Sequence, residues 1–184
     1  MAVSSSKVKR AMVRVGLISD THGLLRPEAK AFLRGSDYIV HGGDVGDPGI
    51  LDELAALAPL TAVRGNNDRG PWAERLRETE CLQVGEVFVY AIHDLAHLEI
   101  EPNAAGIHVV VSGHSHKPLV EKRRGVLYVN PGSSGPRRFK LPIAVGELLI
   151  EGRSVSARVV DLWDSARSGE SHDFRPTIPV VLRW

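Results

Sequence analysis

The first eighty residues alternate between short apolar runs with strand character and segments with helix-forming features. The strand-like runs are residues 13–19, 38–40 and 61–63, and the helical segments are residues 27–34, 50–58 and 71–79. A strand followed by a helix, repeated three times, favours a parallel sheet that is buried beneath helices. This alternation therefore predicts an α/β fold.

After Cys81 the pattern changes to a series of strands without intervening helices. The strand-like segments are residues 87–92, 108–112, 126–129, 144–150 and 155–160. Glycine or charged turns separate them, which favours antiparallel pairing in the second half of the chain. We therefore predict two packed sheets with helices outside, in a single domain.

The length of 184 residues fits one domain with a sizeable core. We place the domain at residues 13–162. Residues 1–12 begin as a polar, basic stretch, and we interpret them as a disordered start or a remnant of the expression vector, with a short basic contact arm as the alternative. Residues 163–184 form a C-terminal extension, expected either as a closing strand packed on the domain or as an exposed arm.

The overall charge and the cysteine count limit the classes of partner. The net charge is +1, which gives no general attraction to nucleic acid or to an anionic membrane. The single cysteine excludes an internal disulfide and fits a cytoplasmic setting. No apolar run approaches the roughly 18 residues of a membrane helix. We expect no membrane partner and no stable nucleic-acid complex, and we interpret Lys122-Arg123-Arg124 as part of a hairpin turn.

Polar clusters follow the predicted strands, each one directly after an apolar run. They are Asp20-Thr21-His22, Gly42-Gly43-Asp44, Gly65-Asn66-Asn67-Asp68, His93-Asp94, Gly113-His114-Ser115-His116 and Asn130-Pro131-Gly132-Ser133. In sheets of this kind ligands bind beyond the carboxyl ends of the strands. Separate loops are therefore expected to converge on one site.

The residue types in these clusters are those of a metal site. Asp20 and His22 lie two residues apart, so both side chains can face one centre in an extended loop. Carboxylate oxygen with imidazole nitrogen suits a divalent ion such as Mn, Fe, Co, Ni or Zn, and no cluster contains a cysteine for a thiolate zinc site. Two ions roughly 3.5–4 Å apart need a shared oxygen ligand, for which Asp44 is the candidate.

The order D-x-H, GD, GN-x-D, H and GH-x-H resembles the pattern of the calcineurin-like metallophosphoesterase superfamily, over about residues 13–162. Within it, the single-domain size and the Asn-Pro-Gly-Ser segment resemble the small YfcE-like phosphodiesterases. The resemblance implies a four-layer αββα sandwich and two divalent ions, with manganese expected first and Ni, Co, Fe, Zn or Mg as alternatives. It also implies seven ligands, which are Asp20, His22 and His116 for the first ion, Asn66, His93 and His114 for the second, and Asp44 as the bridge.

The activity that the resemblance implies is hydrolysis of a small phosphodiester, or of an activated phosphomonoester, by a hydroxide that bridges the two ions. Two positions depart from the family pattern. Asn67 stands where many family phosphatases have a histidine that protonates the leaving group, which favours leaving groups that need little protonation. Asp94 follows His93 where the family usually has glycine. It either orients His93 or adds negative charge near the second ion, and a distortion of the loop by Asp94 would weaken the second site.

Four further residues are candidates for substrate binding or for support of the ligands. Asn67 is one of them. Asp68 either orients a ligand histidine or stabilises a turn, and His97 is a candidate for substrate contact or proton transfer. Arg138, next to Arg137, either binds phosphate at the mouth of the site or belongs to a solvated basic turn.

The remaining histidines are expected to have no part in the chemistry. His41 precedes the Gly-Gly-Asp cluster, and we expect it to pack beneath the site with its hydrogen bonds satisfied. His108 and His172 are expected to be structural or exposed.

Two other functions compete with the phosphoesterase. The retromer subunit Vps29, which is similar to this family, is a non-catalytic protein-binding scaffold, but a scaffold is expected to lose metal ligands and here all seven positions coordinate. A nuclease acting on DNA ends usually carries additional domains. The apolar end, residues 178–184, could pair with a second copy in a homodimer or a larger homo-oligomer.

Overall fold

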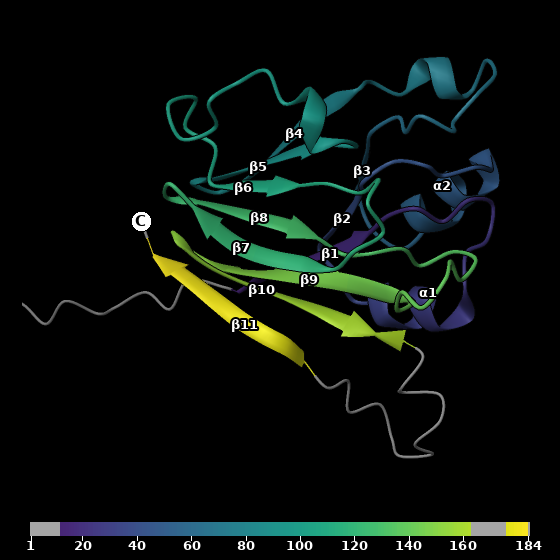
Figure 1. Ribbon diagram of the computed structural model, residues 1–184. Coiled ribbons are helices and arrows are strands. Elements are labelled where there is room, and N and C mark those ends of the chain that lie inside the picture. The colour runs from purple at the N-terminus through teal and green to yellow at the C-terminus, as the bar shows by residue number, and fades with distance from the viewer. Residues whose placement is uncertain (1–11, 163–175, 184) are drawn as a thin grey trace, which may run out of the picture.

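The computed structural model describes residues 12–162 and 176–183, in which two β-sheets pack face to face (Figure 1). The first sheet, sheet A, has the order β11-β10-β9-β1-β2-β3. Its strands are β1 (Val13–Ile18), β2 (Tyr38–His41), β3 (Leu60–Ala62), β9 (Ala144–Glu151), β10 (Ser154–Asp161) and β11 (Pro176–Arg183). The three N-terminal strands pair in parallel, as the strand–helix alternation predicts.

The second sheet, sheet B, has the order β4-β5-β6-β8-β7. Its strands are β4 (Thr79–Val84), β5 (Val87–Ile92), β6 (Val109–Val111), β7 (Leu119–Arg123) and β8 (Val126–Asn130). The prediction of antiparallel pairing throughout the second half is wrong for β6, which pairs in parallel with both β5 and β8. The chain crosses over between β5 and β6 through residues 93–108, and a connection of this length permits parallel pairing.

The main core lies between the two sheets. Every second residue of β5 points into it, namely Val87, Val89 and Ala91, and they meet the inward side chains of sheet A such as Leu17 and Leu148. All five of these side chains are buried, as the alternating pattern of a strand with one buried face requires.

Helices α1 (Pro27–Leu33) and α2 (Pro48–Ala55) cover the outer face of sheet A, so that this sheet is buried on both faces. Each helix has a proline in its first turn, where the missing N–H costs nothing. The Asp47 side chain caps α2 by accepting a hydrogen bond from the Gly49 amide at 2.7 Å.

The outer face of sheet B is covered by the 3-10 helix η2 (Leu95–His97) and the irregular residues 98–107. Leu95, Leu98 and Ile107 pack there against Ile92 and Val110. The molecule is thus an α/β sandwich whose fourth layer is thin: in the part of the chain that is described, it holds one 3-10 turn and no α-helix.

The predicted helix at residues 71–79 is wrong. Only the 3-10 helix η1 (Ala73–Arg75) forms there, and the chain then enters β4, which pairs antiparallel with β5. Strands β4 and β7 were not predicted from the sequence. Both lie at sheet edges and expose residues on one face, so pairing with a neighbouring strand rather than local hydrophobicity determines their structure.

The basic segment at residues 122–124 lies at the β7–β8 hairpin. Lys122 and Arg123 belong to β7, and the turn itself consists of Arg124 and Gly125. At the C-terminus, β11 pairs antiparallel with β10 at the edge of sheet A. Residues 1–11, 163–175 and 184, with His172 among them, lie outside the described residues, and within the described ranges no helix is long and apolar enough to span a membrane.

Candidate metal centre

Loops that follow five strands meet at one edge of the sandwich and carry the seven predicted ligands. The loop after β1 carries Asp20 and His22, and the loop after β2 carries Asp44. The loops after β3 and β5 carry Asn66 and His93, respectively. The loop after β6 carries His114 and His116. Short distances connect these side chains in an unbroken series, so the structure brings all seven together.

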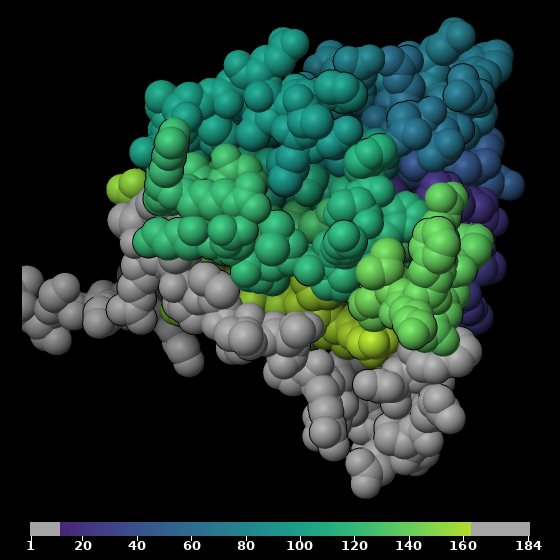
Figure 2. All heavy atoms as spheres, viewed as in Figure 1, coloured from purple at the N-terminus to yellow at the C-terminus, as the bar shows by residue number. Residues whose placement is uncertain are grey.

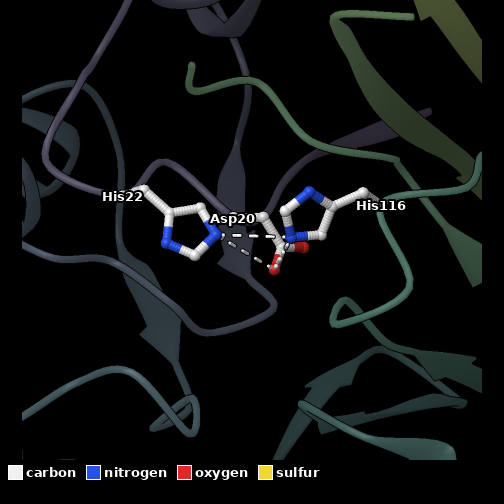
Figure 3. Close-up of side chains that lie close together, drawn as sticks. All are labelled: Asp20, His22 and His116. Atoms are coloured by element: carbon white, nitrogen blue, oxygen red, sulfur yellow. Dashed lines mark hydrogen bonds and ion pairs between the residues drawn. The ribbon is translucent and has the colours of Figure 1, made fainter. Parts of the chain in front are cut away.

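Asp20, His22 and His116 form the first group (Figure 3). The Nε2 atom of His116 lies 3.2 Å from Asp20 Oδ1 and 3.3 Å from Nε2 of His22. Both imidazole rings therefore turn a nitrogen toward the same carboxylate, as Figure 3 shows. Three potential ligand atoms converge on one point, which is the arrangement that a divalent ion requires.

Asp20 provides the clearest test of whether these residues fit a metal ion. Its side chain is fully buried, and Oδ2 accepts a hydrogen bond from Ser19 Oγ at 2.7 Å, but Oδ1 has no hydrogen-bond partner among the described residues. A buried carboxylate oxygen without a partner is costly unless a cation satisfies it. The donor set is therefore suited to a bound metal ion.

Asp44, Asn66, His93 and His114 form the second group. The Nε2 atom of His93 lies 3.5 Å from Asp44 Oδ2 and 3.0 Å from Asn66 Oδ1, which in turn lies 3.1 Å from His114 Nδ1. Asp44 Oδ2 is also 3.7 Å from Nε2 of His22 in the first group. Asp44 thus stands between the two groups, where a bridging carboxylate is expected.

Backbone groups fix the orientation of His93. Its Nδ1–H donates to the Gly42 carbonyl at 2.7 Å, and this bond directs Nε2 toward Asp44 Oδ2 and Asn66 Oδ1. Metal-binding histidines are commonly held by such a hydrogen bond through the second ring nitrogen. His93 is therefore oriented for metal binding by the protein itself.

Five of the seven predicted ligands have left-handed backbone conformations. Asp20, His22, Asp44, His114 and His116 have φ values of 53°, 45°, 55°, 65° and 57°. Such conformations are costly for residues with a side chain and are concentrated at functional sites. The surrounding structure therefore holds these side chains at a conformational cost.

Glycine is required where the loops touch one another. A Cβ atom on Gly65 would lie 2.1 Å from the Asp44 amide nitrogen, and one on Gly113 would lie 2.1 Å from Ser19 Oγ. No side chain can be accommodated at such distances, because real Cβ atoms do not approach so closely. These two glycines allow the β1, β2, β3 and β6 loops to pack closely.

The electrostatics differ among the ligands. Burial raises the pKa of Asp44, but hydrogen bonds from His93 and Asn67 outweigh it and hold this pKa well below the ordinary value. Burial lowers the pKa of His93, while the Asp44 carboxylate and the Gly42 carbonyl raise it, so the net shift is upward. Burial also lowers the pKa of His22, and the Arg138 guanidinium adds to this effect against the opposing pull of Asp44.

Of the two roles considered for Asn67, the structure shows hydrogen bonds to a predicted ligand. Its amide N–H donates to Asp44 Oδ1 at 2.8 Å, and its side-chain Nδ2 donates to Asp44 Oδ2 at 2.6 Å. Asp68 is different: its two carboxylate oxygens accept the Gly46 and Gly65 amides at 2.9 and 2.8 Å. Asp68 therefore ties two loops together, which matches the turn-stabilising alternative.

Asp94 contacts the other histidine of the second group. Its Oδ1 caps η2 by accepting the Ala96 amide at 2.9 Å, and its Oδ2 lies 3.5 Å from His114 Nε2. The predicted role in orienting His93 is not seen, since the Gly42 carbonyl fills it.

The remaining substrate candidates lie on two sides of the centre. His97 lines a cleft that His93 also lines. Arg138 is exposed and close enough to His22 to influence its pKa. It belongs to the segment at residues 136–141, which Figure 2 shows in light green at the surface, beside the purple N-terminal part of the chain.

Two polar residues of the Asn-Pro-Gly-Ser segment support the site. Asn130 Nδ2 donates to the Gly113 carbonyl at 2.7 Å and to Ser115 Oγ at 3.1 Å, and Ser133 Oγ donates to the Asp20 carbonyl at 2.9 Å. The sequence marked this segment as a motif but did not indicate that it holds the loops of two ligand clusters.

His41 lies beneath the site and is fully buried. The Gly43 amide donates to Nδ1 at 3.1 Å, so the ring proton lies on Nε2, which donates to Thr21 Oγ1 at 3.0 Å. The threonine hydroxyl in turn donates to the Val45 carbonyl at 2.9 Å. Burial lowers the pKa of His41 to about 4, so the ring is neutral at physiological pH. His108 accepts the Phe88 amide at 3.2 Å and is structural.

An α/β sandwich with histidine and carboxylate groups at its strand ends defines a class of metal-binding protein. Residues 13–152 match the family described as the calcineurin-like phosphoesterase superfamily domain. The chain therefore belongs to this superfamily, which confirms the family indicated by the motifs. A protein of Methanothermobacter thermautotrophicus named "probable metallophosphoesterase" is 37% identical over 158 residues, which are 79% of this chain and 91% of that protein.

Solved structures share the fold at lower identity. Vps29 from Cryptosporidium parvum has a TM-score of 0.76 at 20% identity, covering 94% of this chain and 99% of that chain. The phosphoesterase YfcE from E. coli has a TM-score of 0.65 at 22% identity, covering 91% and 98%. Both a phosphoesterase and a vacuolar protein sorting protein thus share this architecture, so the fold alone does not distinguish them.

Proposed function

We propose that the protein is a dinuclear metal-dependent phosphoesterase that hydrolyses small phosphodiesters or activated phosphomonoesters. The observation that carries the proposal is the buried Oδ1 of Asp20, which has no partner among the described residues and faces Nε2 of His116. Asp20, His22 and His116 would hold one ion, and Asn66, His93 and His114 the other, with Asp44 shared. Bound ions of this kind neutralise phosphate charge and lower the pKa of an attacking water.

The protein's own residues contribute orientation and charge. Gly42 fixes the ring of His93, and Asn67 fixes both oxygens of Asp44. Arg138 supplies an exposed guanidinium near His22, suited to a non-bridging phosphate oxygen.

The preference for diesters and activated esters follows from Asn67. An amide at this position cannot give a proton to a leaving alcohol, so a leaving group that needs little protonation reacts best unless another side chain supplies the proton. Asn67 is in addition engaged with Asp44 through its backbone N–H and through its side-chain Nδ2.

We extend the proposal to manganese as the native metal and to a cytoplasmic location. Oxygen and nitrogen ligands without thiolate suit manganese among several divalent ions. The single cysteine, Cys81, is free and exposed, as is common in a reducing compartment. The proposed partner is a small substrate, without nucleic acid or membrane, and a homo-oligomer is compatible with it.

The test is metal-dependent activity. The protein is stripped with chelator and assayed with bis-p-nitrophenyl phosphate after addition of Mn, Ni, Co or Mg, with elemental analysis of bound metal. We expect activity with at least one metal and loss of activity in Asp44→Asn and His116→Ala. Asp52→Asn, at an exposed position of α2, is the matched control and retains activity. Absence of both activity and stoichiometric metal would refute the proposal and favour the scaffold function.

A further inference from the structure

A cleft of about 810 Å³ adjoins the second group of ligands. Asn66 and His93 line both the cleft and the candidate metal centre. Clefts of roughly 300–1,000 Å³ accommodate organic ligands of drug size, so this space greatly exceeds the need of a phosphate group alone. The cleft therefore has room for an organic part of the substrate.

Apolar side chains form one part of the cleft wall. Tyr90 and Ile92 are on the outer face of β5, and Ile100 follows η2 with 38% of its surface exposed. Apolar wall atoms favour a flat ring over a small polar alcohol such as glycerol, since burying the ring removes apolar area from water.

The charged residues of the cleft do not select a charged ligand. Arg64 donates to Glu78 at 2.5 Å, so these two side chains neutralise each other. Arg69 and Glu99 are exposed at the cleft and carry opposite charges, and Asp94, which also lines it, has Oδ2 3.5 Å from His114 Nε2. Asp68 is buried and accepts two backbone amides. The size of the cleft and its apolar wall are therefore the features that select a ligand.

His97 is the histidine of the cleft wall that is not a predicted metal ligand, and histidine is the side chain that most often acts as a general acid. It ends the 3-10 helix η2, whose start is capped by Asp94 through the Ala96 amide at 2.9 Å. Asn67, in contrast, directs its side chain to Asp44 and does not line the cleft. His97 is therefore the candidate proton donor to a group bound in the cleft.

We propose that the cleft receives the leaving alcohol of the substrate, a flat and largely apolar ring, and that His97 protonates it. The inference rests on the proposed phosphoesterase function. As the oxygen of the attacking water forms a bond to phosphorus, the phosphorus–oxygen bond to the leaving group breaks. Its electron pair stays on the leaving oxygen, which takes the proton of the His97 imidazolium. The neutral imidazole then regains a proton from solvent, and the alcohol departs through the cleft.

Binding of non-hydrolysable probes tests the cleft without catalysis. We compare phenylphosphonate with methylphosphonate on the manganese-loaded protein by isothermal titration calorimetry. The wild type is expected to prefer the phenyl probe about tenfold, which corresponds to burial of part of a ring. Ile100→Ser should reduce the preference below about threefold, whereas Met12→Ser, an exposed apolar residue before β1, should keep it. Equal binding of both probes by the wild type would overturn the assignment of the cleft.

Leaving-group dependence tests His97. The substrates are bis-p-nitrophenyl phosphate, with a good leaving group, and diphenyl phosphate, with a poorer one. His97→Gln should lower kcat/KM about a hundredfold for diphenyl phosphate and only about threefold for the nitrophenyl ester, as loss of a general acid predicts. Equal losses with both substrates would refute the proton transfer while the phosphoesterase function stands. A wild type inactive with both substrates would refute the phosphoesterase function itself.

Discussion

Asn67 holds both carboxylate oxygens of Asp44, with its backbone amide on Oδ1 at 2.8 Å and its side-chain amide on Oδ2 at 2.6 Å. Asp44 is 2% exposed and has a left-handed backbone with φ of 55°. Its carboxylate is therefore fixed from the side of the β3 loop, while His22 and His93 face the same Oδ2 atom at 3.7 and 3.5 Å.

Replacing Asn67 by alanine is expected to weaken metal binding. The substitution removes the side-chain hydrogen bond to Oδ2 but keeps the backbone bond, so Asp44 gains rotational freedom. Loss of a group that orients a metal ligand typically costs about 10–100-fold in affinity. Titration of metal-free protein with Mn²⁺ measures this change. Asn103→Ala, at an exposed position of the 101–106 loop, is the control, and unchanged affinity in Asn67→Ala would contradict the role.

Asp20→Asn is expected to stabilise the metal-free protein and to remove the stabilising effect of metal. Asp20 Oδ1 is buried without a hydrogen-bond partner among the described residues and lies 3.2 Å from His116 Nε2. An amide nitrogen in that place can donate to the ring nitrogen, which relieves a cost of about 1–3 kcal/mol for an unsatisfied buried group.

Thermal or urea unfolding in chelator measures the first effect, and unfolding with Mn²⁺ measures the second. The wild type should gain stability on addition of metal, and Asp20→Asn should gain little. The prediction fails when the variant is less stable than the wild type in chelator.

His41 makes stability depend on pH in a defined range. Burial lowers its pKa to about 4 in the folded protein, whereas an unfolded histidine has a pKa near 6.5. Between these two pH values the unfolded state binds more protons than the folded state. The contribution of His41 to the free energy of unfolding is therefore complete above about pH 6.5 and is lost as the pH falls toward 4. The full shift corresponds to a contribution on the order of 3 kcal/mol.

Urea unfolding of metal-free protein at several pH values measures this dependence. His41→Gln, which keeps polar groups near Gly43 and Thr21, should be less stable at neutral pH and show a flatter profile between pH 6.5 and 4. An unchanged slope in this variant would assign the dependence to another group.

The sequence could indicate which residues meet at the candidate metal centre, because each of them lies shortly after a strand. Strand-like runs before Asp20 and Asp44 could be recognised from composition, and parallel strands place their following loops at one edge. The structure adds what depends on contacts distant in sequence: the bond from Asn67 to Asp44 spans 23 residues, and that from Ser133 to Asp20 spans 113. No local pattern encodes such pairs.

The strand directions of sheet B could not be predicted for the same reason. Turn composition indicated antiparallel neighbours, but the path of residues 93–108 across the outer face sets β6 parallel to β5. Edge strand β4 exposes Cys81 and Gln83, so its hydrophobic pattern is weak and only pairing with β5 defines it.

Arg124 and His22 have nearly the same strained backbone, with φ of 47° and 45°, but of the two only His22 belongs to the candidate metal centre. Arg124 and Gly125 form the two-residue turn between β7 and β8, and both have positive φ, as a type I′ turn requires. Asn-Gly suits this turn better than Arg-Gly, because asparagine tolerates the left-handed conformation.

Arg124→Asn is therefore expected to raise the free energy of unfolding by about 0.5–1 kcal/mol without a change in activity. The exposed contact of Arg124 with Glu101, at 3.9 Å, contributes little that could be lost. Urea unfolding measures the gain, and Lys122→Asn, within β7, is the control that should lower stability, since asparagine is unfavourable in strands. The same substitution at His22, His22→Asn, would also relieve backbone strain, but it would remove the imidazole of a predicted ligand. This variant should therefore lose metal binding. Backbone strain in this fold is thus removable at a hairpin but not at the metal centre, and a loss of stability in Arg124→Asn would contradict this distinction.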